Sequence, residues 1–375
     1  MTIRKILATL LALSMTLSLA ACGGNSTQTG TAQPEQTEQT EEASSVSDES
    51  APDETTAENT ETETPLDETE ASEPAEKVDI NLAALSGPTA LGMLDLLEKN
   101  ENGEAANNYN VTIATAPDEV TGKIISGELD IAAVPTNVAS TLYNKTEGQV
   151  QIAALNTMGV LYVLETGDTI QSVADLAGKT IYATGQGSTP EYALNLVLEK
   201  NGLTPGEDVE IVFAADNAEI APLLASGEAQ VALLPQPFVT SVLTQNENVR
   251  VALDLTEEWD KAVNGESGLT MGCVVVRKEF AEQNKEALDR FLDEYKQSVE
   301  TVTSEEGLAH AAELAEHYNI IKAAVAEKAI PECNIVFVEG DEMQQIAGGF
   351  LQVLYDANPQ AVGGQLPNDD FYYKR

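Results

Sequence analysis

The chain has 375 residues, of which 62 are acidic and 19 basic, so its formal net charge is −43. A protein this acidic is a poor partner for nucleic acids and anionic membranes, because both are bound through clustered Lys and Arg side chains. Two His and three Cys leave little material for a structural zinc site, which uses about four nitrogen or sulfur ligands, and we expect neither metal nor cofactor. The length and the 42% of hydrophobic residues allow two domains.

The first 22 residues are typical of a secretory signal. Arg4 and Lys5 supply a positive start, an apolar run begins at Ile6, and Leu19-Ala20-Ala21-Cys22 ends it. Small residues before a Cys resemble the lipobox of bacterial lipoproteins, which implies cleavage before Cys22 and a diacylglyceryl thioether on its sulfur. Several acyl chains hold a protein firmly, since each buried CH₂ contributes about 0.8 kcal/mol. The alternative is an ordinary secretion signal followed by a chance Cys.

Residues 23–77 have the composition of a disordered tether. Between Glu35 and Glu76 there are 16 acidic residues and no Lys or Arg, and large apolar residues are almost absent. Such a segment cannot bury enough apolar area to offset the entropy of ordering, and its like charges extend it. A long spacer suits a thick cell wall, which favours a Gram-positive host. Without the signal and the tether, residues 77–375 carry a net charge of −29.

From Val78 onward, strand-like and helix-like segments alternate, which predicts an α/β fold with mostly parallel sheets flanked by helices. We expect strands at 78–85, 109–115, 130–134, 151–155, 161–164, 180–183, 209–213, 230–234, 249–255 and 272–277. We expect helices at 91–99, 117–125, 189–200 and 217–225, and a mostly helical C-terminal part with helices at 284–303, 305–318, 322–329 and 343–358.

Two segments 100 residues apart share one pattern. Ser126-Gly127-Glu128 is followed by Pro135, and Ser226-Gly227-Glu228 is followed by Pro235. Each reads as the end of a helix, a turn whose Gly takes a left-handed conformation, a buried parallel strand and a Pro before the next helix. The repeat favours two lobes built alike, each with its own sheet. Chance recurrence of a common turn triplet is the alternative.

Five loops follow predicted strands and are candidates for a ligand site. Open α/β sheets bind ligands beyond the carboxyl ends of their strands, where helix N-termini offer unpaired N–H groups. None of the five loops contains Arg or Lys. Their candidate residues are Ser86, Gly87, Pro88 and Thr89; Thr136 and Asn137; Asn156 and Thr157; Gly185, Gln186, Gly187, Ser188, Thr189, Glu191 and Tyr192; and Gln236 and Phe238.

The loop at 185–191 carries the strongest signal. Two Gly residues free its backbone for close approach, and Ser188 or Thr189 can cap the following helix, with Ser188 and Glu191 at capping-box spacing. Exposed N–H donors at such a terminus suit a small anion or a carbonyl group. The loop lacks the third Gly of a dinucleotide fingerprint and the Lys-Ser/Thr of a P-loop. Capping alone is an equally good explanation of the hydroxyl side chains in these loops.

The loops also limit the class of ligand. A free carboxylate is often clamped by a bidentate Arg, so the absence of Arg disfavours ordinary amino acids. Tyr192 and Phe238 can stack on a planar ligand or pack in the core. A neutral planar molecule such as a pyrimidine and a small anion held by backbone N–H groups both stay open, and the acidity of the chain favours the neutral molecule.

The sequence offers little support for catalysis. His310 and His317 stand two helical turns apart in the C-terminal part, where we expect them at the surface, and there is no Gly-x-Ser-x-Gly elbow. Cys273 and Cys333 form either a disulfide or two buried thiols. We therefore expect a binding protein and not an enzyme.

Several features together resemble the solute-binding lipoproteins of ABC importers, in particular the nitrate, sulfonate, taurine and thiamine-precursor group with the periplasmic-binding-protein type II fold. These features are the lipobox, the acidic tether, Gly87-Pro88-Thr89, Asn156-Thr157-Met158-Gly159, the 185–191 loop, Leu233-Leu234-Pro235-Gln236-Pro237 and Met271-Gly272-Cys273. The resemblance implies two α/β lobes joined by crossing segments near 165–169 and 265–270. Lobe one then comprises 78–165 plus 268–375, and lobe two comprises 166–267.

The resemblance also implies a function. It adds Met271 to the ligand-binding candidates and implies a lipid-anchored monomer on the extracellular face of the membrane, which closes on a small solute and delivers it to an ABC permease and its ATPase. The lipid anchor is then its only membrane contact. One alternative is an enzyme on the same fold in thiamine or menaquinone precursor metabolism, which the signal peptide and the lack of a catalytic His disfavour. Another is a surface ligand sensor without a transporter.

Overall fold

The structure is a computed structural model that describes residues 76–115 and 117–375. The predicted signal peptide, Cys22 and most of the predicted tether lie outside these residues. The chain divides into two units, Met1–Glu70 and Ala71–Arg375, and all described residues belong to the second. No helix in this described part has both the length and the hydropathy that crossing a membrane requires.

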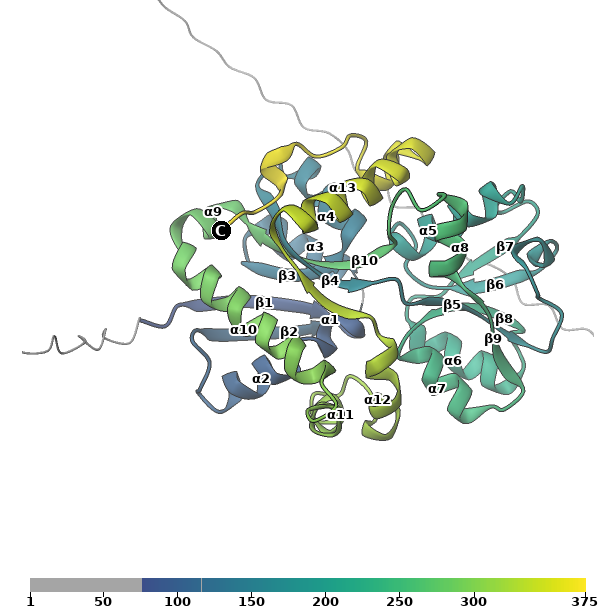
Figure 1. The fold of residues 1–375 in the computed structure, drawn as a ribbon, viewed down its shortest axis with the longest axis horizontal. Helices are drawn as coiled ribbons and strands as arrows, with labels where there is room; N and C mark the ends of the chain where they lie inside the picture. The colour runs from purple at the N-terminus through teal and green to yellow at the C-terminus, as the bar shows by residue number, and fades with distance from the viewer. Residues whose placement is uncertain (1–75, 116) are drawn as a thin grey trace, which may run out of the picture. The chain divides into compact units, whose positions relative to one another are not determined.

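Two sheets with helices around them form the frame of the described chain (Figure 1). The first has the strand order β11-β4-β10-β3-β1-β2 and consists of β1 (Asp79–Leu85), β2 (Asn108–Ala114), β3 (Ile131–Pro135), β4 (Val150–Met158), β10 (Thr270–Arg277) and β11 (Ile335–Val338). The second has the order β7-β6-β8-β5-β9 and consists of β5 (Leu161–Thr166), β6 (Thr180–Ala183), β7 (Glu210–Phe213), β8 (Val231–Pro235) and β9 (Val249–Asp254). We call each sheet with its helices a lobe.

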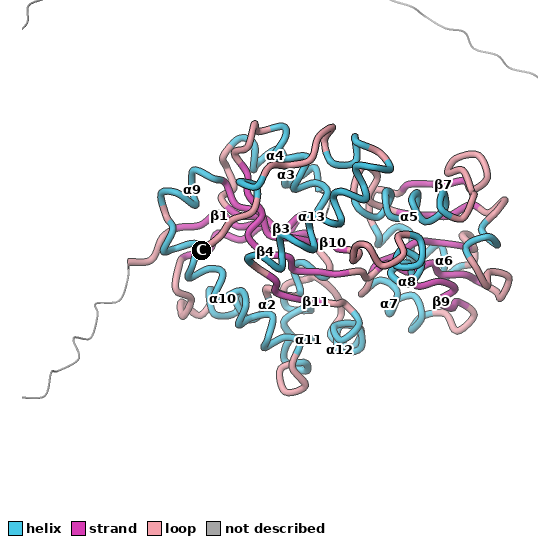
Figure 2. The backbone as a smooth tube through the Cα atoms, turned by 45° about the horizontal axis from the view of Figure 1, so that its top comes forward, coloured by secondary structure: helices cyan, strands magenta, loops and turns pink. Residues whose placement is uncertain are grey.

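The helices, cyan in Figure 2, are described in three groups in chain order. The first lobe begins with α1 (Pro88–Leu91), α2 (Leu94–Glu101), α3 (Pro117–Ser126) and α4 (Thr136–Lys145). The second lobe holds α5 (Thr189–Lys200), α6 (Asn217–Ser226), α7 (Phe238–Gln245) and α8 (Leu255–Ala262). The C-terminal part adds α9 (Lys278–Gln283), α10 (Lys285–Thr303), α11 (Leu308–His317), α12 (Ala323–Ala329) and α13 (Gly340–Ala357) to the first lobe. The predicted helices and strands are confirmed, with their ends shifted by a few residues.

The predicted α/β fold is confirmed, and both sheets are mixed because each also contains a strand that runs against its parallel strands. β1 pairs in parallel with β2 and β3, and β6 with β7 and β8. β10 comes from the second lobe and pairs antiparallel with β3 and β4, while β5 comes from the first lobe and pairs antiparallel with β8 and β9. A strand that arrives from the other lobe enters its sheet where the parallel strands end, so it must run against them. Alternation alone does not reveal such crossings.

The internal repeat is confirmed at the level of topology. β3 and β8 have bounds 100 residues apart and follow α3 and α6, and the orders β4-β10-β3-β1-β2 and β9-β5-β8-β6-β7 match position by position. Gly127 and Gly227 follow α3 and α6 with φ of 80° and 79°, which is the left-handed region that a Gly adopts without steric cost. Each lobe therefore places a strand from the other lobe at the same position in its sheet.

The first crossing lies earlier than the sequence predicted. Residues 161–165 pair with β8, so the chain leaves the first sheet after Met158 and enters the second at Leu161. The predicted boundary at residue 165 therefore falls inside β5. Only two residues separate two apolar strands here, so composition shows no break. The return crossing runs over residues 262–270, close to its predicted place.

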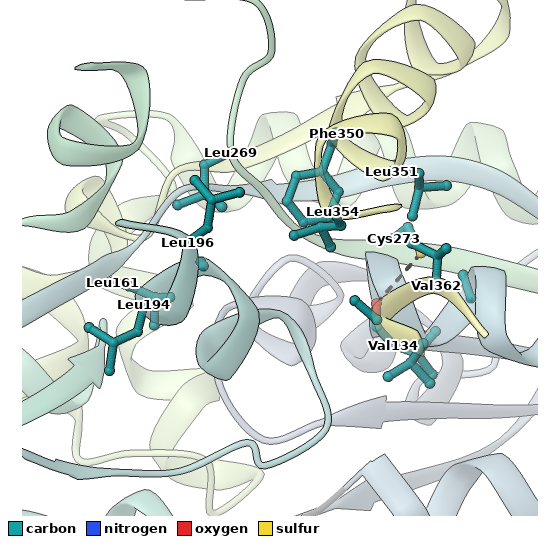
Figure 3. Close-up of a cluster of buried hydrophobic side chains, with 14 of the residues drawn as sticks. Val134, Leu161, Leu194, Leu196, Leu269, Cys273, Phe350, Leu351, Leu354 and Val362 are labelled. Carbon is teal, nitrogen blue, oxygen red and sulfur yellow. Dashed lines mark hydrogen bonds between the residues drawn. The ribbon is translucent and has the colours of Figure 1, made fainter. Parts of the chain in front are cut away.

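One hydrophobic core extends through both lobes (Figure 3). Leu161 and Leu194 of the second lobe belong to the same buried cluster as Cys273 and Leu354 of the first. Helix α13 packs against α5, and Trp259 of α8, which is fully buried, lies with its ring centroid 5.5 Å from that of Phe350 on α13. The lobes are therefore joined by packed side chains as well as by the two crossings.

The two Cys residues of the described chain are free, buried thiols, so the disulfide alternative is wrong. They belong to different hydrophobic clusters, and the Sγ of Cys273 donates to the carbonyl oxygen of Val134 at 3.6 Å. Burial raises the pKa of both thiols, which keeps them protonated. They act here as small core residues.

His310 and His317 lie at the surface of α11, as the sequence predicted. Their Nε2 atoms are 2.7 and 3.1 Å from carboxylate oxygens of Glu98 and Glu101 on α2. These contacts join the C-terminal helices to the N-terminal part of the first lobe.

Glu165 holds the end of β5 to its neighbours in the second lobe. Its side chain is 3% exposed and accepts hydrogen bonds from Thr169, from the backbone N–H of Ile170 and from Arg250 at 2.8 Å. Burial alone raises the pKa of this carboxyl group, but the hydrogen bonds and the charge of Arg250 together hold the pKa below its ordinary value of 4.5. The charged form of Glu165 therefore stabilises the folded state.

We expect Glu165→Gln to lower the free energy of unfolding at pH 7 by about 1–3 kcal/mol, measured by urea denaturation, because charge-assisted hydrogen bonds are lost. The pKa is lower in the folded state, so the stabilisation is present above the ordinary value of 4.5 and is lost as the pH falls through the folded pKa. The difference between variant and wild type should therefore shrink in acid. Glu247→Gln, an exposed change in the same lobe, is the control and should be neutral. Equal stability of the Glu165 variant and the wild type at pH 7 would contradict this account.

Candidate ligand-binding site

A cavity of about 130 Å³ lies between the two lobes, at the carboxyl ends of their parallel strands. The first lobe contributes Leu85, Ser86, Pro88, Thr89, Thr115, Pro135, Thr157, Met271 and Gly272 to its lining. The second lobe and the first crossing contribute Val160, Thr184, Gly185, Ser188, Pro190, Ala215, Asp216, Asn217 and Pro235. The strand-end loops of the two lobes therefore face each other across one space.

Seven of the candidate residues from the sequence line this cavity: Ser86, Pro88, Thr89, Thr157, Gly185, Ser188 and Met271. Gln186 and Gly187 line an adjoining groove of about 620 Å³ instead, together with residues of α3 and α4. The groove and the cavity share Gly185 and Ser188, so the loop at 185–188 forms a wall of both. A role of these residues in binding stays a prediction.

The other candidates do not line the cavity. They are Gly87, Thr136, Asn137, Asn156, Thr189, Glu191, Tyr192, Gln236 and Phe238. Thr136 Oγ1 is 3.1 Å from Thr270 Oγ1, and Gln236 Oε1 accepts from the backbone N–H and the hydroxyl of Thr240. Tyr192 and Phe238 are half-buried against hydrophobic clusters, which is the core role that the sequence left open for them.

Side-chain capping does not explain the hydroxyl residues of these loops. Thr89 Oγ1 donates to the carbonyl oxygen of Leu85, and Ser188 Oγ donates to that of Gly185, each at 2.7 Å, and neither α1, α4 nor α5 has a side-chain cap. The predicted capping box is therefore wrong. Glu191 accepts from the backbone N–H of Gly187 at 2.5 Å, not from that of Ser188. Positive φ values of 76° and 74° at Gly185 and Gly187 fold the loop so that this earlier N–H meets the carboxylate.

Asn137 connects the two lobes beside the cavity. Its side chain is 1% exposed, and its Nδ2 donates to the carbonyl oxygen of Ala361 at 3.0 Å and to that of Gly187 at 3.4 Å. Its Oδ1 accepts from the hydroxyl of Thr189 at 3.1 Å. Asn137 thus ties α4 of the first lobe to the 185–189 loop of the second, and both amide protons are used within the protein.

The floor of the cavity requires a residue without a side chain at position 272. A Cβ atom on Gly272 would lie 2.5 Å from Asn156 Oδ1, 2.9 Å from Thr89 Cγ2 and 3.3 Å from Thr157 Oγ1. Asn156 is fully buried and accepts from Thr157 Oγ1 at 3.2 Å. Its Nδ2 has no hydrogen-bond partner among the described residues, so the amide buried beneath the floor is only partly satisfied.

The cavity has a single charged lining residue, Asp216, and no Lys or Arg among its described lining. Asp216 precedes α6 and accepts from the backbone N–H of Ala218 at 2.8 Å, as a helix N-cap does. Next to it, Asn217 Oδ1 accepts from the hydroxyl of Thr184 at 2.8 Å. Within residues 76–115 and 117–375, no three His, Cys, Asp or Glu side chains are grouped so that they could hold a metal ion.

The lining residues that were not among the candidates from the sequence include Thr115, Thr184, Ala215, Asp216 and Asn217. Thr115 follows β2, Thr184 follows β6, and Ala215, Asp216 and Asn217 follow β7. All stand after the carboxyl end of a parallel strand, so the rule that selected the other loops also selects these. Thr184 directly precedes the predicted loop at 185–191 and Thr115 lies two residues before Pro117, so the sequence carries a signal for both. The segment at 214–217 contains neither Gly nor Pro, and only the sheet order places it at the cavity.

Comparisons with known proteins agree with this geometry. The family described as "ABC transporter, phosphonate, periplasmic substrate-binding protein" matches residues 95–327. No curated protein matches the chain. Among solved structures, an ABC transporter from Parabacteroides distasonis is 25% identical, with a TM-score of 0.65 and an alignment that covers 79% of this chain and 99% of that one.

Two further solved structures are more distant and show similarity of fold alone. The alkanesulfonate-binding protein SsuA from Xanthomonas axonopodis pv. citri, bound to MOPS, is 16% identical with a TM-score of 0.60, over 78% of this chain and 96% of that one. The periplasmic nitrate-binding protein NrtA from Synechocystis PCC 6803 is 14% identical with a TM-score of 0.50, over 64% of this chain and 66% of that one.

We expect Gly272→Ala to lower the free energy of unfolding by about 1–3 kcal/mol, because a methyl group is forced against buried Asn156 and Thr89. Thermal and urea denaturation measure the effect. Gly122→Ala is the matched control, since a Cβ at that helical position meets nothing within 4 Å. The control should be neutral or slightly stabilising, as Ala favours a helix more than Gly does. Equal behaviour of the two variants would show that the cavity floor is not close-packed at position 272.

Proposed function

The chain belongs to the family of periplasmic substrate-binding proteins of ABC transporters, and from this premise we propose that it is an extracellular, lipid-anchored receptor for a small solute. It captures the solute between its lobes and delivers it to an ABC permease and its ATPase. The observation that carries the proposal is the cavity of about 130 Å³ to which both lobes contribute. Because the site is divided between the two lobes, solute binding is coupled to the relative position of the lobes, and a transporter can recognise the solute-bound position.

The lining of the cavity supports capture more than chemical conversion. Hydroxyl groups from Ser86, Thr115 and Thr184 and the side chains of Asp216 and Asn217 are set among apolar residues. A few polar groups in an apolar pocket fix the orientation of a ligand and select it. Of the two alternatives, an enzyme on this fold and a sensor without a transporter, neither has a specific observation in its favour.

We propose that the lobes close by rotation about the two crossings, at residues 158–161 and 262–270. The lobes are then formed by 78–158 plus 270–375 and by 161–262, a division that follows the sheets. The hydrogen bonds of Asn137 to Gly187 and Thr189 support a closed arrangement of the lobes here. Opening of the lobes would break these hydrogen bonds. The packed contact between Trp259 and Phe350 would stay closed and keep α8 and α13 together.

The lipid anchor rests on the sequence before the described residues. Leu19-Ala20-Ala21-Cys22 resembles a lipobox, and the acidic stretch that follows has the composition of an extended spacer. We propose that Cys22 is the modified residue and that the receptor works as a monomer on a Gram-positive cell.

The receptor role is tested by the solute that the purified protein retains. We expect protein purified under native conditions to release one small solute on denaturation, detected by mass spectrometry. Readdition of that solute at 100 times its Kd should stabilise the protein by about 2.7 kcal/mol. Gly272→Ala should retain less of it than Gly122→Ala, because only the first change intrudes on the cavity floor. Absence of any retained or stabilising solute would count against the receptor role.

The anchor is tested separately by Cys22→Ala in the full-length chain, expressed in a bacterium that processes lipoproteins. We expect the wild type in the membrane fraction and the variant in the soluble fraction or the medium, because the thioether cannot form. Ser26→Ala is the matched control and should stay with the membrane. Persistence of the Cys22 variant in the membrane fraction would rule out lipidation at this residue as the anchor.

A further inference from the structure

We propose that the solute is uncharged or cationic, about the size of one six-membered ring, and bears an N–H group that donates to Asp216. This inference rests on the proposed function, because it takes the cavity between the lobes as the solute site. It adds a chemical class that the family and its relatives do not specify for this chain.

The volume of the cavity limits the size of the solute. At about 130 Å³, the cavity is slightly smaller than an apolar cavity of roughly 150 Å³ that is known to hold benzene. Apolar walls from Leu85, Val160, Pro190 and Met271 suit the faces of a ring. A ring with one or two small substituents fills such a space, whereas a longer chain would extend into the adjoining groove.

Asp216 supplies a recognition group of defined polarity. Its Oδ1 accepts the N–H of Ala218 at 2.8 Å, which fixes the carboxylate at the start of α6 and leaves its second oxygen for a ligand. Carboxylates accept hydrogen bonds and cannot donate them, so a complementary solute must present a donor there. The hydroxyls of Thr115 and Thr184 donate to Glu119 Oε1 and Asn217 Oδ1, so they offer a solute only an acceptor oxygen, whereas Ser86 can donate or accept.

The magnitudes disfavour an anion in this cavity. A unit negative charge 4 Å from a carboxylate is repelled by about 4 kcal/mol at an effective dielectric of 20. The N-terminus of a helix typically stabilises a nearby anion by about 0.3–1 kcal/mol, and by at most ~2 kcal/mol. The N-terminus of α6 is already paired with Asp216 itself. For an anion that contacts Asp216, the repulsion exceeds what one helix terminus offers.

The charges around the cavity do not favour an anion either. Of its described lining residues, the adjoining groove has one cationic residue, Lys145, and one anionic residue, Asp118. Residues 77–375 carry a net charge of −29, which gives a long-range field unfavourable to anions. The family name specifies a phosphonate, and the names of two structural relatives specify sulfonate and nitrate. We infer that this chain has a different selectivity from those oxyanion receptors.

The test uses named probes and a matched pair of variants. Aniline, an uncharged ring with N–H donors, and benzoate, an anionic ring of similar size, are titrated calorimetrically, together with methylphosphonate and methanesulfonate. Each is measured on the wild type, Asp216→Asn and Asp254→Asn. Asp254 caps α8 with the same 2.8 Å bond to the N–H two residues on, but it does not line the cavity, and Asn caps a helix as well as Asp does.

We expect aniline to bind the wild type and the three anions not to bind. Asp216→Asn should weaken aniline binding about tenfold and reduce the discrimination against benzoate, whereas Asp254→Asn should change neither. The solute released from the native protein should be neutral or cationic at pH 7.

Other outcomes separate the inference from the receptor role. Binding of methylphosphonate or methanesulfonate, unchanged or strengthened in Asp216→Asn, would overturn the inference and leave the receptor role intact. An anionic retained solute would do the same. Equal effects of the two Asn variants, or no binding of aniline, would count against recognition by Asp216. Failure of every probe together with the absence of a retained solute would count against both proposals.

Discussion

Strands β5 and β10 impose the constraint on which the rest of the described structure depends. Each starts next to the other lobe and is inserted between two strands that run the opposite way. Because both begin at the carboxyl ends of the parallel strands, those ends must face one another across the crossings. The loops of both lobes therefore line one space, and residues far apart in sequence, such as Thr89 and Ser188, line the same cavity.

The same arrangement governs how freely the lobes can move. Two short crossings can act as a hinge only if the other contacts between the lobes can break. These contacts are of two kinds, polar and apolar. The hydrogen bonds of Asn137 to the 185–189 loop are few and can exchange with water. The contact of Trp259 with Phe350 belongs to a continuous core, and its separation would expose apolar area at a cost of about 25 cal/mol per Å². Motion that breaks the polar contacts and preserves the core is therefore the least costly.

Much of this fold could be predicted from the sequence because its signals are local. The apolar strands, the helix periodicity and the repeat of Ser-Gly-Glu turns at 126–128 and 226–228 each reflect one segment and its own burial. The direction of β5 and β10 could not be predicted, because strand polarity depends on connections between distant segments. The capping box at Ser188 and Glu191 failed for a related reason: spacing shows which groups can meet, and the positive φ of Gly185 and Gly187 decides which N–H does.

The candidate site was predictable only in part. Gly- and Pro-rich loops are visible in a sequence, whereas Thr115 and Asp216 look like ordinary polar residues until the sheet order places them at the cavity. Asn137 shows the converse, since it lies in the first turn of α4 beside the other lobe, but both of its amide protons are donated within the protein. A polar residue at a strand end thus has two possible uses, contact with the solute or contact between lobes. Only the pairing of its hydrogen-bonding atoms tells them apart.

The large negative charge of the chain acquires a more specific meaning from this placement. Most of its acidic residues stand in the predicted tether or at the surface, where they act at long range and are screened by salt. Asp216 is a single carboxylate among many, but it stands in a small cavity whose described lining holds no Lys or Arg. Between Asp216 and a solute in contact with it, screening by salt is weak, so the carboxylate itself sets the sign of their electrostatic interaction. In the receptor proposed here, the net charge of the chain disfavours anions at long range, and Asp216 disfavours them within the cavity.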